Sequence, residues 1–242
     1  MKIGIFGDSY SSVLPTHTGL AWPSILEQDF EVENYSLPGE TMQFIYSNFM
    51  DNYHKYDKVI VVPTYPIRFN SEFCKISSLP HLEFLKDKTT WTLKQTKILD
   101  AVYNYMVYAL EDKIMERNHI MAYNAMIKVM QGTGKDILWI PAFHFLHSMW
   151  PSVTTLGQIT AMEQTAWGSQ WTEYTRQKGG GGDARQCHLT EENNLRLARL
   201  VKNKLPSLSR SEYLDYTLED FAAPDDINRY KNDIVYDKKI IR

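Results

Sequence analysis

The sequence predicts an α/β fold built on a mostly parallel sheet. Three short apolar runs carry this prediction: Ile3–Phe6, Lys58–Pro63 and Asp136–Ala142. Each has the length of a buried strand, and segments with helical spacing of apolar residues separate them. Strands that alternate with helices are typical of βαβ units, which join parallel strands. The length of 242 residues suits one large domain of this class.

The elements of the first part of the chain follow in a regular order. The first strand ends at Gly7-Asp8, a turn signal. A short helical stretch through Ile25 and an alternating strand over Glu31–Ser36 come next. Thr41–Tyr53 is amphipathic and predicts a helix that leads to the second buried strand.

The second part of the chain is richer in helix. Thr92–Met130 predicts a long helical insertion, taken as about 91–131, with a break near Asn118-His119. Leu189–Leu205 predicts a helix with Thr190 as its N-cap. We therefore expect one domain over residues 1–205. The charged, tyrosine-rich residues 206–242 are expected to form a C-terminal extension that wraps the surface or contacts a neighbour.

Composition narrows the classes of partner. The formal net charge is −3, so no basic excess is available to bind nucleic acid. Cys74 and Cys187 are too few for a disulfide framework or a multi-cysteine metal site. No signal-peptide core and no run of roughly 20 apolar residues is present, so we expect no membrane association and a cytoplasmic location.

Three loops place reactive residue types at the ends of predicted strands. Ser9 follows the first strand, Gly39 follows the second, and His188 precedes the last long helix, with Asp183 upstream of it. The carboxyl ends of parallel strands meet at one rim of a sheet. A serine nucleophile needs a nearby base, and the oxyanion formed in the reaction needs N–H donors. This rim could supply all of these groups.

Three sequence blocks resemble those of the SGNH (GDSL-like) hydrolases. Gly7–Ser11 resembles the nucleophile block, Asn34–Thr41 resembles the block whose glycine donates an oxyanion N–H, and His188–Thr190 resembles the block of the catalytic histidine. The resemblance covers most of residues 1–205 and leaves the tail out. It implies a three-layer α/β/α sandwich. The irregular middle and the tail are similar to those of SGNH-like proteins from phage genomes, which implies association with the virion if the chain is phage-encoded.

The chain departs from the family pattern in its third block. The family carries an asparagine oxyanion donor after the third strand, and Val62–Arg68 contains none. Thr64, Arg68 or Asn70 would have to take its place.

The acid of the family also stands elsewhere. The family places it three residues before the histidine, where this chain has Arg185, and the nearest acid is Asp183. By the resemblance, Ser9 is the nucleophile, His188 the general base and then general acid, and Asp183 the residue that orients His188. The backbone N–H groups of Ser9 and Gly39 would bind the oxyanion.

Ester hydrolysis through an acyl-enzyme is the function that this constellation favours. Aromatic residues are frequent in the stretch 143–174, which favours a carbohydrate ester, as in O-deacetylation. The missing asparagine and the displaced acid favour an alternative, a non-catalytic SGNH-like binding or structural protein that could form part of a larger phage assembly. Acyl transfer between two alcohols would use the same residues. A protein partner or oligomer contact through the tail is left open.

No cofactor or metal is predicted. The run Gly4–Ser9 lacks the third glycine of a dinucleotide site, and Gly132–Asp136 lacks the spacing and the Ser or Thr of a phosphate-binding loop. His144 and His147 have a spacing that could bind a metal, but no third ligand forms a pattern with them, and structural histidines are favoured.

Overall fold

A five-stranded parallel sheet forms the centre of the molecule. The computed structural model describes residues 1–13, 21–65, 68–70, 75–76, 82–83, 86, 91–109, 112–143, 154–160 and 189–222. The strand order is β2-β1-β3-β6-β7, and every neighbouring pair is parallel. The strands are β1 (Lys2–Gly7), β2 (Glu31–Asn34), β3 (Lys58–Val62), β6 (Asp136–Trp139) and β7 (Ser211–Tyr213). The predicted α/β fold with a parallel sheet is confirmed.

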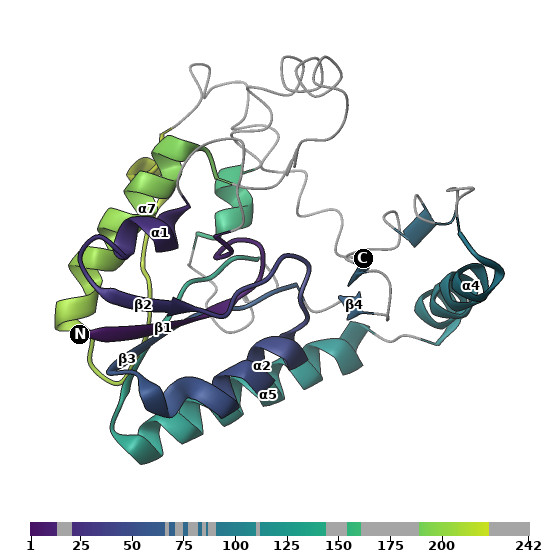
Figure 1. Cartoon of the computed structure of the whole chain (residues 1–242), viewed down its shortest axis with the longest axis horizontal. Coiled ribbons are helices and arrows are strands. Elements are labelled where there is room, and N and C mark those ends of the chain that lie inside the picture. The colour runs from purple at the N-terminus through teal and green to yellow at the C-terminus, as the bar shows by residue number, and fades with distance from the viewer. Residues whose placement is uncertain are drawn as a thin grey trace.

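Helices cover both faces of this sheet, which gives the predicted three layers. Helices α1 and α7 lie over one face, and α2 and α5 lie over the other (Figure 1). The helices are α1 (Trp22–Leu26), α2 (Met42–Asn52), α4 (Leu93–Tyr108), α5 (Asp112–Thr133) and α7 (Glu191–Lys204). A separate two-stranded antiparallel sheet pairs β4 (Phe69–Asn70) with β5 (Lys75–Ile76).

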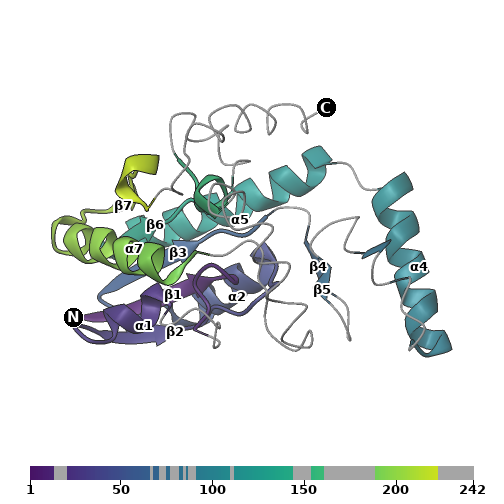
Figure 2. The ribbon, with the colours of Figure 1, turned by 90° about the horizontal axis from the view of Figure 1, so that it is seen from above.

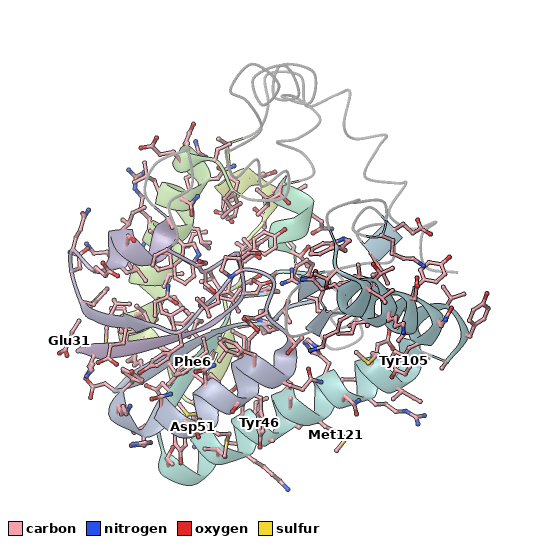
Figure 3. All side chains as sticks on the ribbon, turned by 45° about the vertical axis from the view of Figure 1, so that its right-hand side comes forward. Phe6, Glu31, Tyr46, Asp51, Tyr105 and Met121 are labelled. Atoms are coloured by element: carbon pink, nitrogen blue, oxygen red, sulfur yellow. The ribbon has the colours of Figure 1, made fainter. Side chains whose placement is uncertain are left out.

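The alternation of side chains along each strand produces two cores. Ile3 and Ile5 of β1 lie in the core that includes residues of α1 and α7. Phe6 lies in the other core, with residues of α2 and α5 (Figure 3). Successive side chains of a strand point to opposite faces, so one short apolar strand supplies both layers.

Helix capping follows the sequence closely. The Thr41 hydroxyl accepts a hydrogen bond from Phe44 N at the start of α2, and the Thr190 hydroxyl accepts one from Asn193 N at the start of α7, each at 3.3 Å. Both threonines satisfy a backbone N–H that has no partner within the helix. The predicted N-cap at Thr190 is confirmed.

The long helical region differs from its prediction in where it is broken. Helix α4 ends at Tyr108 and α5 begins at Asp112, whereas the sequence predicted a break near Asn118-His119. That prediction was wrong because His119 is 2% exposed within continuous helix rather than at a helix end. The second half of α5 packs against the sheet, while α4 lies away from it (Figure 2).

Residues beyond 205 contribute to the same domain core. The short strand β7 pairs with β6, with Ile137 opposite Ser211. Leu214 and Phe221 are buried in the core beneath α7. The segment up to Ala222 therefore completes the sheet and contributes to one core. The rest of the predicted extension lies outside the described residues.

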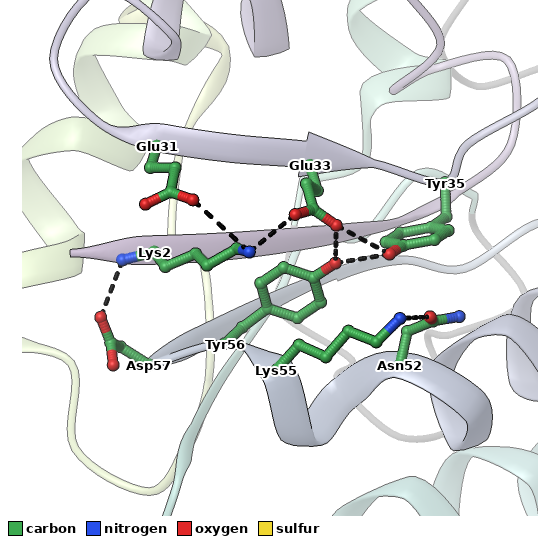
Figure 4. A network of polar contacts seen from close by, with 8 residues as sticks. All are labelled: Lys2, Glu31, Glu33, Tyr35, Asn52, Lys55, Tyr56 and Asp57. Atoms are coloured by element: carbon green, nitrogen blue, oxygen red, sulfur yellow. Dashed lines mark hydrogen bonds and ion pairs between the residues drawn. The ribbon is translucent and has the colours of Figure 1, made fainter.

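A polar cluster at the edge of the sheet fastens β2 to its neighbours (Figure 4). Glu33 accepts hydrogen bonds from the hydroxyls of Tyr56 at 2.5 Å and Tyr35 at 2.9 Å, and it forms a 2.7 Å ion pair with Lys2. The hydrogen bond from Lys2, followed by those of Tyr56 and Tyr35, lowers the pKa of Glu33 to about 2. The edge strand is thus held by an ionised carboxylate.

Among the described residues, no helix is both long enough and apolar enough to cross a membrane.

Candidate active site

Four predicted site residues lie at one rim of the sheet. Ser9 follows β1, Gly39 follows β2, and Thr64 and Arg68 follow β3. These three strands are parallel and lie in the order β2-β1-β3. The carboxyl ends of neighbouring strands are therefore about 5 Å apart. Ser9 and Gly39 are partly exposed. The other predicted residues, His188 and Asp183, lie outside the described residues.

Asp8, the residue before Ser9, is the centre of a buried polar network. Its side chain is 0% exposed and forms a 3.0 Å ion pair between Oδ2 and Arg68 Nη1. The Thr64 hydroxyl donates to the same oxygen at 3.0 Å, and Tyr10 N donates to Oδ1 at 3.0 Å. The network therefore joins the turn that contains Ser9 to the segment after β3.

The electrostatics of Asp8 are a balance between burial and its partners. Burial raises the pKa of Asp8, while the Arg68 charge and the hydrogen bonds from Tyr10 N and Thr64 act in the opposite direction. A buried carboxylate stays charged only where such partners compensate for lost hydration. Among these partners, the Arg68 charge contributes most to favouring the ionised form of Asp8.

Thr64 and Arg68 were predicted as oxyanion or substrate-binding residues. In this structure the Thr64 hydroxyl hydrogen is directed to Asp8, and Arg68 Nη1 also donates to the Glu40 carbonyl at 3.4 Å. Their contacts are with the residues that flank the two expected backbone donors. The role of each as a direct oxyanion donor stays a prediction.

The Ser9 turn is also tied to the segment that leads to Gly39. Ser11 Oγ donates to Ser36 Oγ at 2.8 Å, and Asn34 Nδ2 donates to the Ser11 carbonyl at 2.6 Å. Asn34 Oδ1 in turn accepts from Ser36 N at 2.9 Å. The first two hydrogen bonds join the loops after β1 and β2, and the third fixes the Asn34 side chain against its own loop. Gly39 itself has a φ of 73°, a conformation that glycine adopts without strain.

A second chain of contacts joins the Ser9 turn to the start of α7. Trp22 Nε1 donates to the Tyr10 carbonyl at 2.8 Å, and Trp22 N donates to Asn194 Oδ1 at 3.0 Å. Asn194 Nδ2 donates to the Leu189 carbonyl at 3.0 Å. Leu189 directly follows His188 in the sequence and belongs to the same apolar core as Tyr10 and Trp22.

Aromatic rings line the rim beside Ser9. The ring of Phe143, just after β6, lies 5.3 Å from that of Tyr10 and 5.7 Å from that of Tyr65. The Arg68 guanidinium carbon lies 5.5 Å from the centre of the Phe143 ring. Tyr65 is 37% exposed, so this group of rings reaches the surface.

Sequence reasoning identified the backbone positions of the rim but missed the residues that connect them. Trp22 and Asn194 carried no chemical signal, since each acts through hydrogen bonds to distant backbone groups. The Asp8–Arg68 pair also carried no signal, because only the pairing of β1 with β3 brings these two residues together.

No group of three or more His, Cys, Asp or Glu side chains suited to a metal ion occurs within the described residues. His144 and His147 lie outside them.

The comparisons with known proteins give distant structural similarity only. No protein-family model and no curated protein sequence matches the chain. The structure is similar to a protein assigned to the G-D-S-L family of lipolytic proteins from Desulfitobacterium hafniense DCB-2, with a TM-score of 0.34 and 16% identity over 73% of each chain.

Two further solved structures are similar. One is the lipase/acylhydrolase from Enterococcus faecalis, with a TM-score of 0.36, 14% identity and coverage of 86% of this chain and 97% of that one. The other is the acetyl xylan esterase AlAXEase, with a TM-score of 0.34, 12% identity and coverage of 98% and 99%.

Proposed function

We propose that the protein is a serine-dependent ester hydrolase that acts through an acyl-enzyme. The observation that carries the proposal is the joining of Ser9 and Gly39 on one rim by hydrogen bonds between their loops. An acyl-transfer site needs a nucleophile and oxyanion donors held in fixed relation, and this geometry supports that requirement.

The proposed reaction runs in two halves. Ser9 Oγ attacks the ester carbonyl carbon while His188 takes the hydroxyl proton, and the carbonyl oxygen becomes an oxyanion bound by the N–H groups of Ser9 and Gly39. The tetrahedral intermediate expels the alcohol, which receives the proton from His188. Water then attacks the acyl-enzyme by the same steps and releases the acid and free Ser9. Asp183 would orient the His188 ring.

A carbohydrate ester is the substrate class that we favour. The exposed Tyr65 ring lies 5.7 Å from the Phe143 ring at an interplanar angle of 57°, so the two rings offer an angled apolar surface at the rim that carries Ser9. Sugar rings pack on such surfaces through their C–H faces, so an O-acyl group on a pyranose could reach the nucleophile while its ring rests there.

A labelling experiment tests the reaction without a known substrate. The protein is incubated with a fluorophosphonate probe and its intact mass is measured, with Ser9→Ala, His188→Ala and, as a matched control, Ser47→Ala on the exposed face of α2. We expect one adduct, lost in Ser9→Ala, slowed sharply in His188→Ala and unchanged in Ser47→Ala. Folded protein that forms no adduct, at probe levels that label a known serine hydrolase, would contradict the proposal.

A specific observation favours a second candidate, a non-catalytic binding or structural protein. The segment from Val62 to Arg68 lacks the family's asparagine, and the Thr64 hydroxyl donates to Asp8. Loss of one oxyanion donor costs on the order of 10²–10³ in rate. Ester binding without turnover by the unmodified protein would support this candidate.

A further inference from the structure

A single guanidinium group contacts the residue next to each expected oxyanion donor. Arg68 Nη1 lies 3.0 Å from Asp8 Oδ2, and Asp8 precedes Ser9. The same nitrogen donates at 3.4 Å to the carbonyl of Glu40, which follows Gly39. The donors of Ser9 and Gly39 belong to different loops, so their spacing depends on what joins those loops.

We propose that Arg68 is a positioning residue that sets the spacing of the two backbone oxyanion donors by holding Asp8 and Glu40 together. The proposal rests on the proposed function for its catalytic meaning. Arg68 acts here through the loops of Ser9 and Gly39.

The Asp8 side of this contact is rigid. The Asp8 carboxylate accepts Tyr10 N at 3.0 Å, so it closes the turn that has Ser9 at its centre. Arg68 approaches the oxygen that also accepts the Thr64 hydroxyl. A shift of Arg68 would therefore move the whole turn, including the Ser9 N–H.

Burial makes the contact strong and specific. The Arg68 side chain is 9% exposed and that of Asp8 is 0% exposed, so water screens their interaction little. The guanidinium also packs over the Phe143 ring, which restricts its orientation. A planar guanidinium gives directional hydrogen bonds that a lysine ammonium, a point charge, does not.

Stability alone is a poor explanation for this arrangement. Arg68 Nε is buried and has no hydrogen-bond partner among the residues that the structure describes, which costs free energy. Apolar residues of similar volume often stabilise a protein as well as a buried ion pair does. A role in geometry accounts for a charged group that bridges two loops despite this cost.

The test combines hydrogen–deuterium exchange with kinetics on the full chain. The first variant is Arg68→Gln. The second is Thr64→Val, which removes a hydrogen bond to Asp8 and leaves the hydrogen bond from Arg68 to Glu40 in place. The matched control is Arg199→Gln, at an exposed arginine of α7. We expect Arg68→Gln to speed amide exchange in peptides covering both 8–13 and 36–44. Thr64→Val should speed amide exchange in 8–13 alone, and Arg199→Gln should change exchange in neither segment.

The kinetic arm uses fluorophosphonate labelling of Ser9 and hydrolysis of a small aryl ester. A displaced donor misplaces the oxyanion site, so Arg68→Gln should lower kcat and the labelling rate by about 10- to 100-fold with little change in KM. Arg68→Lys keeps the ion pair and should fold even if Arg68→Gln does not. Its kcat should fall between those of the wild type and Arg68→Gln.

The outcomes separate the two proposals. If the wild type is not labelled but Arg68→Gln speeds exchange in both segments, the proposed function fails and the positioning contact stands. Unchanged exchange in 36–44 in Arg68→Gln would overturn the positioning role. So would equal effects of Thr64→Val on both segments. If Arg68→Gln does not fold, an Arg68→Lys protein with wild-type exchange and kcat would overturn it.

Discussion

Replacing Gly7 by alanine tests the close packing beneath the Ser9 turn. A Cβ at this position would lie 2.2 Å from Ser11 Oγ, 2.8 Å from Val62 Cβ and 3.0 Å from the Val62 carbonyl oxygen. Val62 pairs with Gly7 in the sheet and cannot move alone. Ser11 can rotate away only by losing its 2.8 Å hydrogen bond to Ser36 Oγ.

The cost follows from these two effects. Overpacking costs about 1–3 kcal/mol and the loss of a buried hydrogen bond about 1 kcal/mol, so Gly7→Ala should lower the free energy of unfolding by about 2–4 kcal/mol. For a chain of this size, each kcal/mol corresponds to about 2–4 °C, which predicts a melting temperature lower by roughly 4–16 °C.

Urea and thermal denaturation followed by circular dichroism measure this change. The control is Gly132→Ala, because Gly132 lies in α5 with no atom within 4 Å of an added Cβ. That variant should be more stable by about 0.5–1 kcal/mol, since alanine loses less backbone entropy than glycine in a helix. Gly7→Ala with Ser11→Ala removes the nearest clash and should cost less than the sum of the single variants. An unchanged urea midpoint for Gly7→Ala would refute the packing argument.

Three further predictions concern other parts of the fold. The folded-state pKa of Glu33, about 2 against an ordinary 4.5, means that its stabilisation is present above pH 4.5 and lost as the pH falls toward 2. Glu33→Gln should therefore reduce the dependence of the urea midpoint on pH in that range. The same pH dependence in the variant and the wild type would contradict this. Burial lowers the pKa of His119 to about 3 from 6.5. The free energy of unfolding of the wild type should therefore fall by about 2 kcal/mol between pH 7.5 and pH 5, because the unfolded chain takes up a proton there. His119→Leu should abolish that fall in the same titration. Asn193 Oδ1 accepts from Ala222 N at 2.7 Å, and Asn193 Nδ2 donates to the Ala222 carbonyl at 3.3 Å. Asn193→Ala should therefore lower the free energy of unfolding by about 1–3 kcal/mol and speed proteolysis near residue 217. Equal cleavage rates in the variant and the wild type would count against this contact.

Local patterns predicted the centre of the fold well. The strands around Ile5, Ile60 and Leu138 are apolar enough to be recognised, because a strand buried on both faces needs no polar residues. The start of α7 was recognised because Thr190 and the apolar spacing after it agree. These signals lie within a few residues of the elements they specify.

Long-range features were less predictable. Strand β7 reads Ser211-Glu212-Tyr213, with no apolar pattern, and forms because β6 offers an open edge. The break between α4 and α5 has no proline or glycine at Tyr108 or Asp112 to mark it.

The candidate site divides in the same way. The places of Ser9 and Gly39 at strand ends were predictable, since each follows a short strand and a turn signal. The pairing of Asp8 with Arg68 was not, because 60 residues separate them and only the parallel alignment of β1 with β3 brings them together.

The position of β7 has a consequence for biosynthesis. A ribosome makes the chain from the amino terminus, so the first four strands of the sheet are complete while β6 still lacks a neighbour on its outer side. Ile137, Leu138 and Trp139 then form an apolar edge until Tyr213 has left the ribosome exit tunnel. Exposed strand edges of this kind pair readily with other chains. Aggregation of nascent chains, and the need for a chaperone to prevent it, should therefore be greatest for ribosomes stalled between β6 and β7.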